Sequence, residues 1–239
     1  MAMAKRFYGA VGVAPLGDGF TVTLDGRAVR TPAGRQVTLP TEALARAVAG
    51  EWEAQEENVR PHTMPMMQLV NAAIDRVEPH RHEVIEQAVA YARTDLLCYR
   101  ADSPPELTDR QAASWQPLLD WAAETYRARL NVTCGVTPAD QPEAALDALG
   151  AAVEALDDLE LAALARVAGA SGSLIVALAL AAGRIGADEA HAVSQLDESY
   201  QVEKWGEDAE AQARRRRLHA DIRAAAAFRA LARGHTKER

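Results

Sequence analysis

Alternating hydrophobic and polar positions mark the start of the chain as β-rich. Phe20, Val22 and Leu24 alternate with two threonines, and Asp25-Gly26 follows at once. This dipeptide favours the two-residue turn of a tight hairpin. Three further short segments, at residues 7–13, 27–31 and 36–39, bring the expected sheet to about four or five short antiparallel strands.

A helix is predicted directly after these strands. Thr41 can cap its start, and Leu44, Val48 and Trp52 recur every fourth residue, which is the spacing of one helix face. We expect that face to pack on the sheet. The following cluster, Met64-Pro65-Met66-Met67, is interpreted as a gap-filling seam between domains, with an adaptable binding surface as the alternative.

From His80 onward the apolar positions keep the period of helices almost to the end of the chain. Thr108-x-x-Gln111 has the form of a capping box that starts one of these helices. The run Leu174 to Ala182 is apolar on all sides, which predicts the central helix of a bundle. A helix from Ala187 to Trp205 is expected beside it, and a last helix over about residues 207–233.

These periods predict an α+β protein with a small antiparallel β-rich N-terminal domain, followed by a larger all-α helical bundle domain. We expect the first domain, with its one packed helix, at residues 1–62 and the second at residues 63–239. The boundary falls where Pro61 and Pro65 interrupt the pattern.

Composition and charge narrow the classes of partner. The 239 residues carry a net charge of -8, and the arginine-rich segment from residue 209 onward is basic, so the rest is more acidic still. An acidic body argues against nucleic acid as the main partner. The longest apolar run is too short to cross a bilayer, and the N-terminus lacks the apolar core of a secretory signal. We therefore expect a cytoplasmic protein without membrane insertion.

Known catalytic and metal motifs find no match. His80, His82, Glu83 and Glu86 do not have the spacing of an established metal site, and Cys98 and Cys134 are expected to be two free thiols.

Tyr91 and Asp95 lie one helical turn apart, so they form either a proton-transfer pair or, as we favour, a buried carboxylate tied to the tyrosine hydroxyl or to Arg100. The residues thus indicate a protein that is not an enzyme and has no metal site, with a small cytoplasmic hydrolase using Asp95 or Glu203 as the alternative.

The chemically densest segment is Leu196 to Asp208, where carboxylates, a tyrosine, a glutamine and a tryptophan surround Gly206. Helical geometry puts Leu196, Tyr200 and Glu203 on the covered face, and Gly206 then ends the helix. Two interpretations remain open: a corner held by Trp205 with solvated acids, or a recognition surface for a protein partner. The candidate partner-binding residues are Glu198, Gln201, Glu203, Trp205, Glu207 and Asp208.

Several motifs in collinear order carry a family resemblance. They include Lys5-Arg-Phe-Tyr, Leu24-Asp-Gly-Arg, Glu51-Trp52, Ala73-Ile-Asp75, Thr94-Asp-Leu-Leu-Cys-Tyr-Arg100, Gly172-Ser173 and Asp197-Glu198-x-x-Gln201-x-Glu203-x-Trp205-Gly206-Glu207-Asp208. With these motifs the chain resembles the ATP-twelve chaperone family, assembly factors for the F(1) sector of ATP synthase. The resemblance implies a β-rich domain before an all-α domain, binding of the unassembled ATP synthase alpha subunit until the beta subunit replaces it, and no cofactor. Mitochondrial members carry a presequence that this chain lacks, so a bacterial relative is expected.

Overall fold

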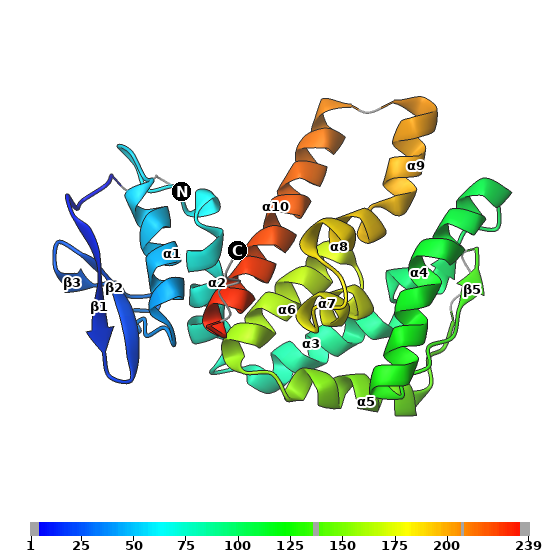
Figure 1. The fold of residues 1–239 in the computed structure, drawn as a ribbon, viewed down its shortest axis with the longest axis horizontal. Coiled ribbons are helices and arrows are strands. Elements are labelled where there is room, and N and C mark those ends of the chain that lie inside the picture. Colours follow the sequence, from blue (N-terminus) through cyan, green and yellow to red (C-terminus); the bar gives the residue numbers. More distant parts are fainter. Residues whose placement is uncertain (1–4, 136–138, 207, 235–239) are drawn as a thin grey trace. The chain divides into compact units, whose positions relative to one another are not determined.

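The structure is a computed structural model that describes residues 5–135, 139–206 and 208–234. A small antiparallel sheet comes first and helices make up most of the remainder (Figure 1), which confirms the predicted α+β class. No helix among these residues is long and apolar enough to cross a membrane.

The chain forms two compact units. One contains the described residues of Met1–Arg81, Asp158–Ala163 and Ala227–Arg239, and the other contains those of His82–Asp157 and Leu164–Ala226. These compact units do not show which parts of the chain can fold independently. The two domains divided after residue 62 therefore remain a prediction.

The sheet has three antiparallel strands in the order β1 (Val11–Leu16), β2 (Gly19–Leu24) and β3 (Arg27–Ala28). Asp25 and Gly26 join β2 to β3 with φ angles of 49° and 78°, the left-handed geometry of the predicted tight turn. The other strand predictions were partly wrong. The strand expected at residues 7–13 lies at Val11–Leu16, and the one expected at residues 27–31 ends at Ala28. Over residues 29–40 the chain turns at Gly34 and makes two isolated bridges, Arg30 with Gln36 and Phe20 with Leu39.

Helix α1 (Glu42–Glu53) packs against β1 and β2, as expected. The hydroxyl of Thr41 caps it by accepting from the amide of Leu44 at 3.1 Å. The short helix η1 (Pro61–Thr63), α2 (Pro65–Ala72) and the π-helical turn η2 (Ala73–Val77) follow. Met64 and Met67 are buried, in keeping with gap-filling side chains rather than an exposed surface.

The remaining elements, apart from the η3 turn (Leu96–Cys98), are helices and two short strands. They are α3 (Arg81–Arg93), β4 (Tyr99–Arg100), α4 (Pro105–Tyr126), β5 (Thr133–Cys134), α5 (Glu143–Glu154), α6 (Asp158–Ser171), α7 (Leu174–Ala181), α8 (Ala187–Ser194), α9 (Leu196–Trp205) and α10 (Ala209–Ala232). Helix α7 is buried from Leu174 to Ala179 and packs against α4 and α8, so the prediction of a central helix is confirmed.

Two local predictions were wrong. Helix α4 begins at Pro105, so Thr108 and Gln111 lie inside it and the capping box is not formed. The helix expected over residues 187–205 breaks at Gln195 into α8 and α9. The indole nitrogen of Trp115 donates to the carbonyl of Val193 at 3.0 Å, and this carbonyl is one that a continuous helix would use for its own next turn.

Candidate functional site

The segment singled out by its chemistry forms α9, a corner, and the start of α10 (Figure 1). Gly206 makes the corner with φ 84° and ψ 171°, a combination essentially open only to glycine. Asp208 caps the start of α10 by accepting from the amide of Ala211 at 2.8 Å. Glu207 lies outside the described residues.

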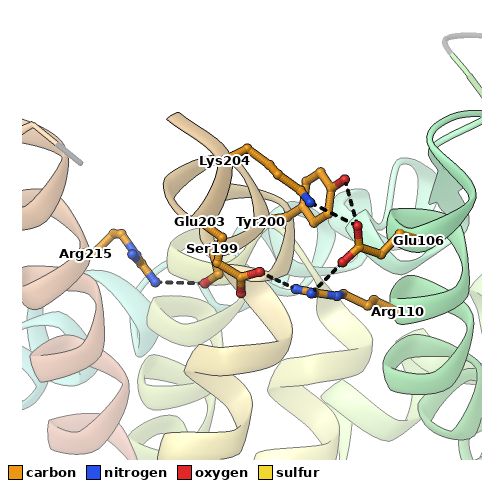
Figure 2. A network of polar contacts seen from close by, with 7 residues as sticks. All are labelled: Glu106, Arg110, Ser199, Tyr200, Glu203, Lys204 and Arg215. Carbon is orange, nitrogen blue, oxygen red and sulfur yellow. Dashed lines mark hydrogen bonds and ion pairs between the residues drawn. The ribbon is translucent and has the colours of Figure 1, made fainter. Parts of the chain in front are cut away.

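One side of α9 is tied to α4 by alternating charges (Figure 2). Arg110 of α4 donates to Glu203 at 2.7 Å and to Glu106, one turn earlier on α4, at 2.9 Å. Lys204 donates to the other oxygen of Glu106 at 3.1 Å. The four side chains therefore form one chain of ion pairs in which each cation meets at least one carboxylate.

Tyr200 lies at the centre of this network and is buried to 6% exposure. Its hydroxyl donates to Glu106 at 3.4 Å, and the cationic groups of Arg110 and Lys204 lie 5.4 and 5.1 Å from the ring centroid. Cations over an aromatic face are attracted by its negative quadrupole. Tyr200 therefore stabilises the contact between α4 and α9 in two ways, by its buried ring and by its interactions with charged side chains.

The ion pairs also set the protonation of their members. The hydrogen bond from Lys204 is the main cause that lowers the pKa of Glu106, and the same bond raises the pKa of Lys204. The hydrogen bond to Glu203 raises the pKa of Arg110. Glu106, Lys204 and Arg110 therefore stay charged near neutral pH, which keeps the ion pairs between them intact.

A second polar contact joins α9 to α10. Arg215 of α10 donates to the hydroxyl of Ser199 at 2.8 Å (Figure 2). Ser199, Tyr200, Glu203 and Lys204 thus all use their side chains to hold α9 against neighbouring helices of the same unit.

The other side of α9 is formed by Glu198, Gln201 and Trp205, spaced three and four residues apart on one helix face. Within the described part of the chain, none of these three side chains has a hydrogen-bond or ion-pair partner. Trp205, at the end of the helix, is 78% exposed. We call Glu198, Gln201 and Trp205 the outer face of α9.

Two expectations about this segment were wrong. Glu203 does not lie on the covered face, because its side chain is 52% exposed and paired with Arg110. Successive helical residues turn by about 100°, so Glu203 sits about 60° around from Tyr200, at the edge that meets α4. Trp205 does not hold the corner, since its ring projects into solvent.

The sequence analysis did not identify the residues that hold the N-terminal end of α9 in place. The amide nitrogen of Gln111 donates to Asp197 at 2.7 Å, and its oxygen accepts from the amide of Ala101 at 2.7 Å. Glu106 and Arg110 were missed as well, although their spacing of four residues on one helix is a local signal for an ion pair. A single sequence does not show which residues, about 90 positions earlier in the chain, contact α9 in the folded protein.

The proposed hydrolytic carboxylate Asp95 lies elsewhere in the same unit and is completely buried. It accepts from Ser173 at 2.6 Å and from the amides of Leu97 and Ile175 at 3.1 Å each, so the expected ties to Tyr91 or Arg100 were wrong. Burial raises the pKa of Asp95 to about 6, although these hydrogen bonds lower it. Among the described residues, no group of three or more histidine, cysteine or acidic side chains has the arrangement of a metal site.

The family described as ATP12 chaperone protein matches residues 5–123. "Protein atp12, mitochondrial" from Schizosaccharomyces pombe is 29% identical over 201 residues, which cover 77% of this chain and 68% of that protein.

Two solved structures are similar over nearly the whole fold. Atp12 from Paracoccus denitrificans shares 44% identity with a TM-score of 0.89 and covers 96% of this chain and 98% of its own. Atu1473 protein from Agrobacterium tumefaciens shares 41% identity with a TM-score of 0.90 and covers 95% of this chain and 85% of its own.

Proposed function

The chain belongs to the ATP12 (ATP-twelve) chaperone family, and from this premise we propose that it binds the unassembled ATP synthase alpha subunit during F(1) assembly. In this role it prevents aggregation of the alpha subunit and releases it to the beta subunit. We place this activity in the bacterial cytoplasm. The observation that carries the proposal is the outer face of α9, where a tryptophan, a glutamine and a carboxylate have no partner among the described residues, on a helix that is anchored on its other side.

The energetics of protein interfaces favour this face as the binding site. Exposed tryptophan is rare on monomers and common among the residues that contribute most to binding. Burying the Trp205 ring in a partner removes a large apolar area from water, and Gln201 and Glu198 supply hydrogen bonds beside it. Their backbone is already ordered by the contacts of Tyr200 and Glu203, so binding costs little additional conformational entropy.

A holding function requires no catalytic group. A subunit that waits for its partner exposes an apolar surface, and such surfaces aggregate unless they are shielded. The hydrolase alternative has no support from either carboxylate, because Asp95 is enclosed by structural donors and Glu203 is paired with Arg110. We therefore infer a role that does not involve catalysis, a metal or a cofactor.

The six candidate residues divide into three groups under this proposal. Glu198, Gln201 and Trp205 form the outer face and contact the partner directly. Glu203 and Asp208 border it, with one oxygen of Asp208 already occupied by the start of α10. Glu207 lies between them in sequence and is retained as a proposed contact.

Light scattering of the alpha subunit alone tests the proposal. We expect the purified chain to suppress aggregation of alpha without nucleotide, and Trp205→Ala to lose most of this effect at an unchanged melting temperature. Phe7→Ala is the matched control, because Phe7 is also a large exposed ring, 71% exposed, but lies in the other unit. Wild-type chain without any effect on scattering contradicts the function, and equal defects in both variants contradict the assignment of the surface.

A further inference from the structure

A pair of histidines joins α8 to α10 in the same unit that carries the outer face of α9. The rings of His191 on α8 and His219 on α10 lie with centroids 4.6 Å apart, tilted by 39°. The Nε2 atom of His219 lies 2.6 Å from a carboxylate oxygen of Asp188, one turn before His191 on α8. This pair of rings is not used by the proposed binding surface.

His191 is placed so that a second proton on its ring has no acceptor. The backbone of Arg215 hydrogen-bonds to one ring nitrogen. The other, Nε2, is buried and has no hydrogen-bond partner. A neutral imidazole tolerates this arrangement, because the unpaired nitrogen carries only a lone pair, whereas an imidazolium has two N–H donors to satisfy. Protonation in the packed state therefore leaves a charged donor buried without a partner.

The surrounding charges oppose the same proton. From α10, His191 faces His219 and the guanidinium of Arg215. The carboxylate of Asp188 on α8 favours this proton, but it is already engaged by His219 and attracted by Arg223. Helix α7 also packs on α8 but carries no titratable side chain. Burial, followed by the charge of His219, lowers the pKa of His191.

The position of α10 determines the position of α9. Arg215, whose backbone bonds to His191, donates through its side chain to Ser199 in the middle of α9. A shift of α10 at His191 therefore disturbs the bond between Arg215 and Ser199, whereas the bonds from α9 to Glu106, Arg110 and Gln111 of α4 do not involve α10.

We propose that the contact between α8 and α10 is an acid-sensitive joint: protonation of His191 separates the two histidine-bearing helices, loosens the α9–α10 hairpin and weakens binding at the outer face of α9. The binding part of this statement rests on the proposed function; the loosening of the hairpin does not. The sign follows from linkage. His191 binds its proton less readily in the packed state than in the open state, so the packed state is favoured above the ordinary histidine pKa and is lost as pH falls below it.

Hydrogen exchange of the full chain, measured by mass spectrometry at about pH 5.5 and about pH 7.5 and corrected for intrinsic rates, tests the joint. We expect the α8 and α10 segments of the wild type to exchange severalfold faster at the lower pH. His191→Gln, which keeps a donor for the backbone of Arg215 but cannot become charged, is expected to abolish this difference. His82→Gln is the matched control, because His82 is a largely exposed histidine of α3 in the same unit, and it should behave as the wild type.

Binding of the alpha subunit over the same pH range tests the consequence. We expect severalfold weaker binding of the wild type at the lower pH and a flat profile for His191→Gln. The joint is overturned if His191→Gln keeps the wild-type pH difference in exchange, or if the wild type shows none. If exchange behaves as expected and alpha does not bind at any pH, the joint stands and the proposed function fails.

Discussion

The hydroxyl of Ser173 donates to the buried carboxylate of Asp95, 78 residues earlier in the chain, at 2.6 Å. The same oxygen of Ser173 accepts from the amide of Val176 at 3.0 Å and caps α7. Asp95 in turn accepts from the amide of Ile175 in the first turn of that helix. A carboxylate at this end of a helix is favoured by the helix dipole. The pair thus fixes the start of the central helix to the segment that follows α3.

Ser173→Ala should destabilise the protein by about 2 to 3 kcal/mol, because it removes a helix cap and a hydrogen bond to a buried carboxylate together. Urea unfolding monitored by circular dichroism measures this loss. Ser199→Ala serves as the control, since that hydroxyl also has one charged partner, Arg215, but is only half-buried. An equal loss in the two variants would show that the Asp95 contact adds nothing.

Asp95 gives the protein a defined pH dependence. Burial raises its pKa from an ordinary value of 3.8 to about 6, so the folded state binds the proton more tightly than the unfolded state. The resulting stabilisation is fully present below about pH 4 and disappears as pH rises through about 6, an effect on the order of 3 kcal/mol. Asp95→Asn lacks this titration. We expect the difference in unfolding free energy between wild type and variant to favour the wild type more at acid pH, and a difference independent of pH would contradict the assignment.

Local patterns in the sequence predicted those elements that depend on local chemistry. Asp25-Gly26 forms its tight turn, Thr41 caps its helix, and the uniformly apolar residues of α7 occupy the core. The break at Gln195 was missed because its cause, the indole of Trp115, comes from a helix far away in sequence. Such a bond overrides helical propensity without any change of composition at the break itself.

The same difference between local and distant contacts applies to the candidate site. Trp205 and Gln201 were found as exposed residues because the helical period assigns them to one face. Glu203 was wrongly assigned to the covered face, because the helical period alone does not show that Arg110 of α4 lies beside it and pairs with it. His191 and His219 lie far apart in the sequence, and the packing of α8 on α10 brings their rings together.

Limited proteolysis should cut first within residues 58–65 or 101–106, where prolines interrupt the helical pattern. The side chain of Gln55 donates to Thr63 and accepts from the amide of Arg60, so the first of these segments is partly held in place. Gln55→Ala is therefore expected to speed cleavage there and leave cleavage at 101–106 unchanged. Mass spectrometry of the early fragments identifies the sites. First cuts within the buried residues Leu174 to Ala179 would contradict the expected domain boundary.

Glu203→Gln separates a direct contact with the alpha subunit from a purely structural role. The Glu203 side chain is about half exposed and its partner Arg110 also pairs with Glu106, so the variant should melt almost as the wild type does. We expect it to keep less alpha subunit soluble, because the amide preserves the shape of the carboxylate and deletes its charge.

Arg110→Gln is the matched variant, since it breaks the same ion pair and leaves the carboxylate of Glu203 in place. If Glu203 contacts the alpha subunit directly, Arg110→Gln retains chaperone activity that Glu203→Gln lacks. If Glu203 acts only by holding α9 to α4, Arg110→Gln loses at least as much activity as Glu203→Gln, because it removes the same bond together with the bond to Glu106, and the double variant loses no more than Arg110→Gln. Light scattering of the alpha subunit with the three variants decides between these outcomes. The direct contact is the expected one, because Tyr200 and Lys204 still tie α9 to Glu106 when the bond between Glu203 and Arg110 is gone.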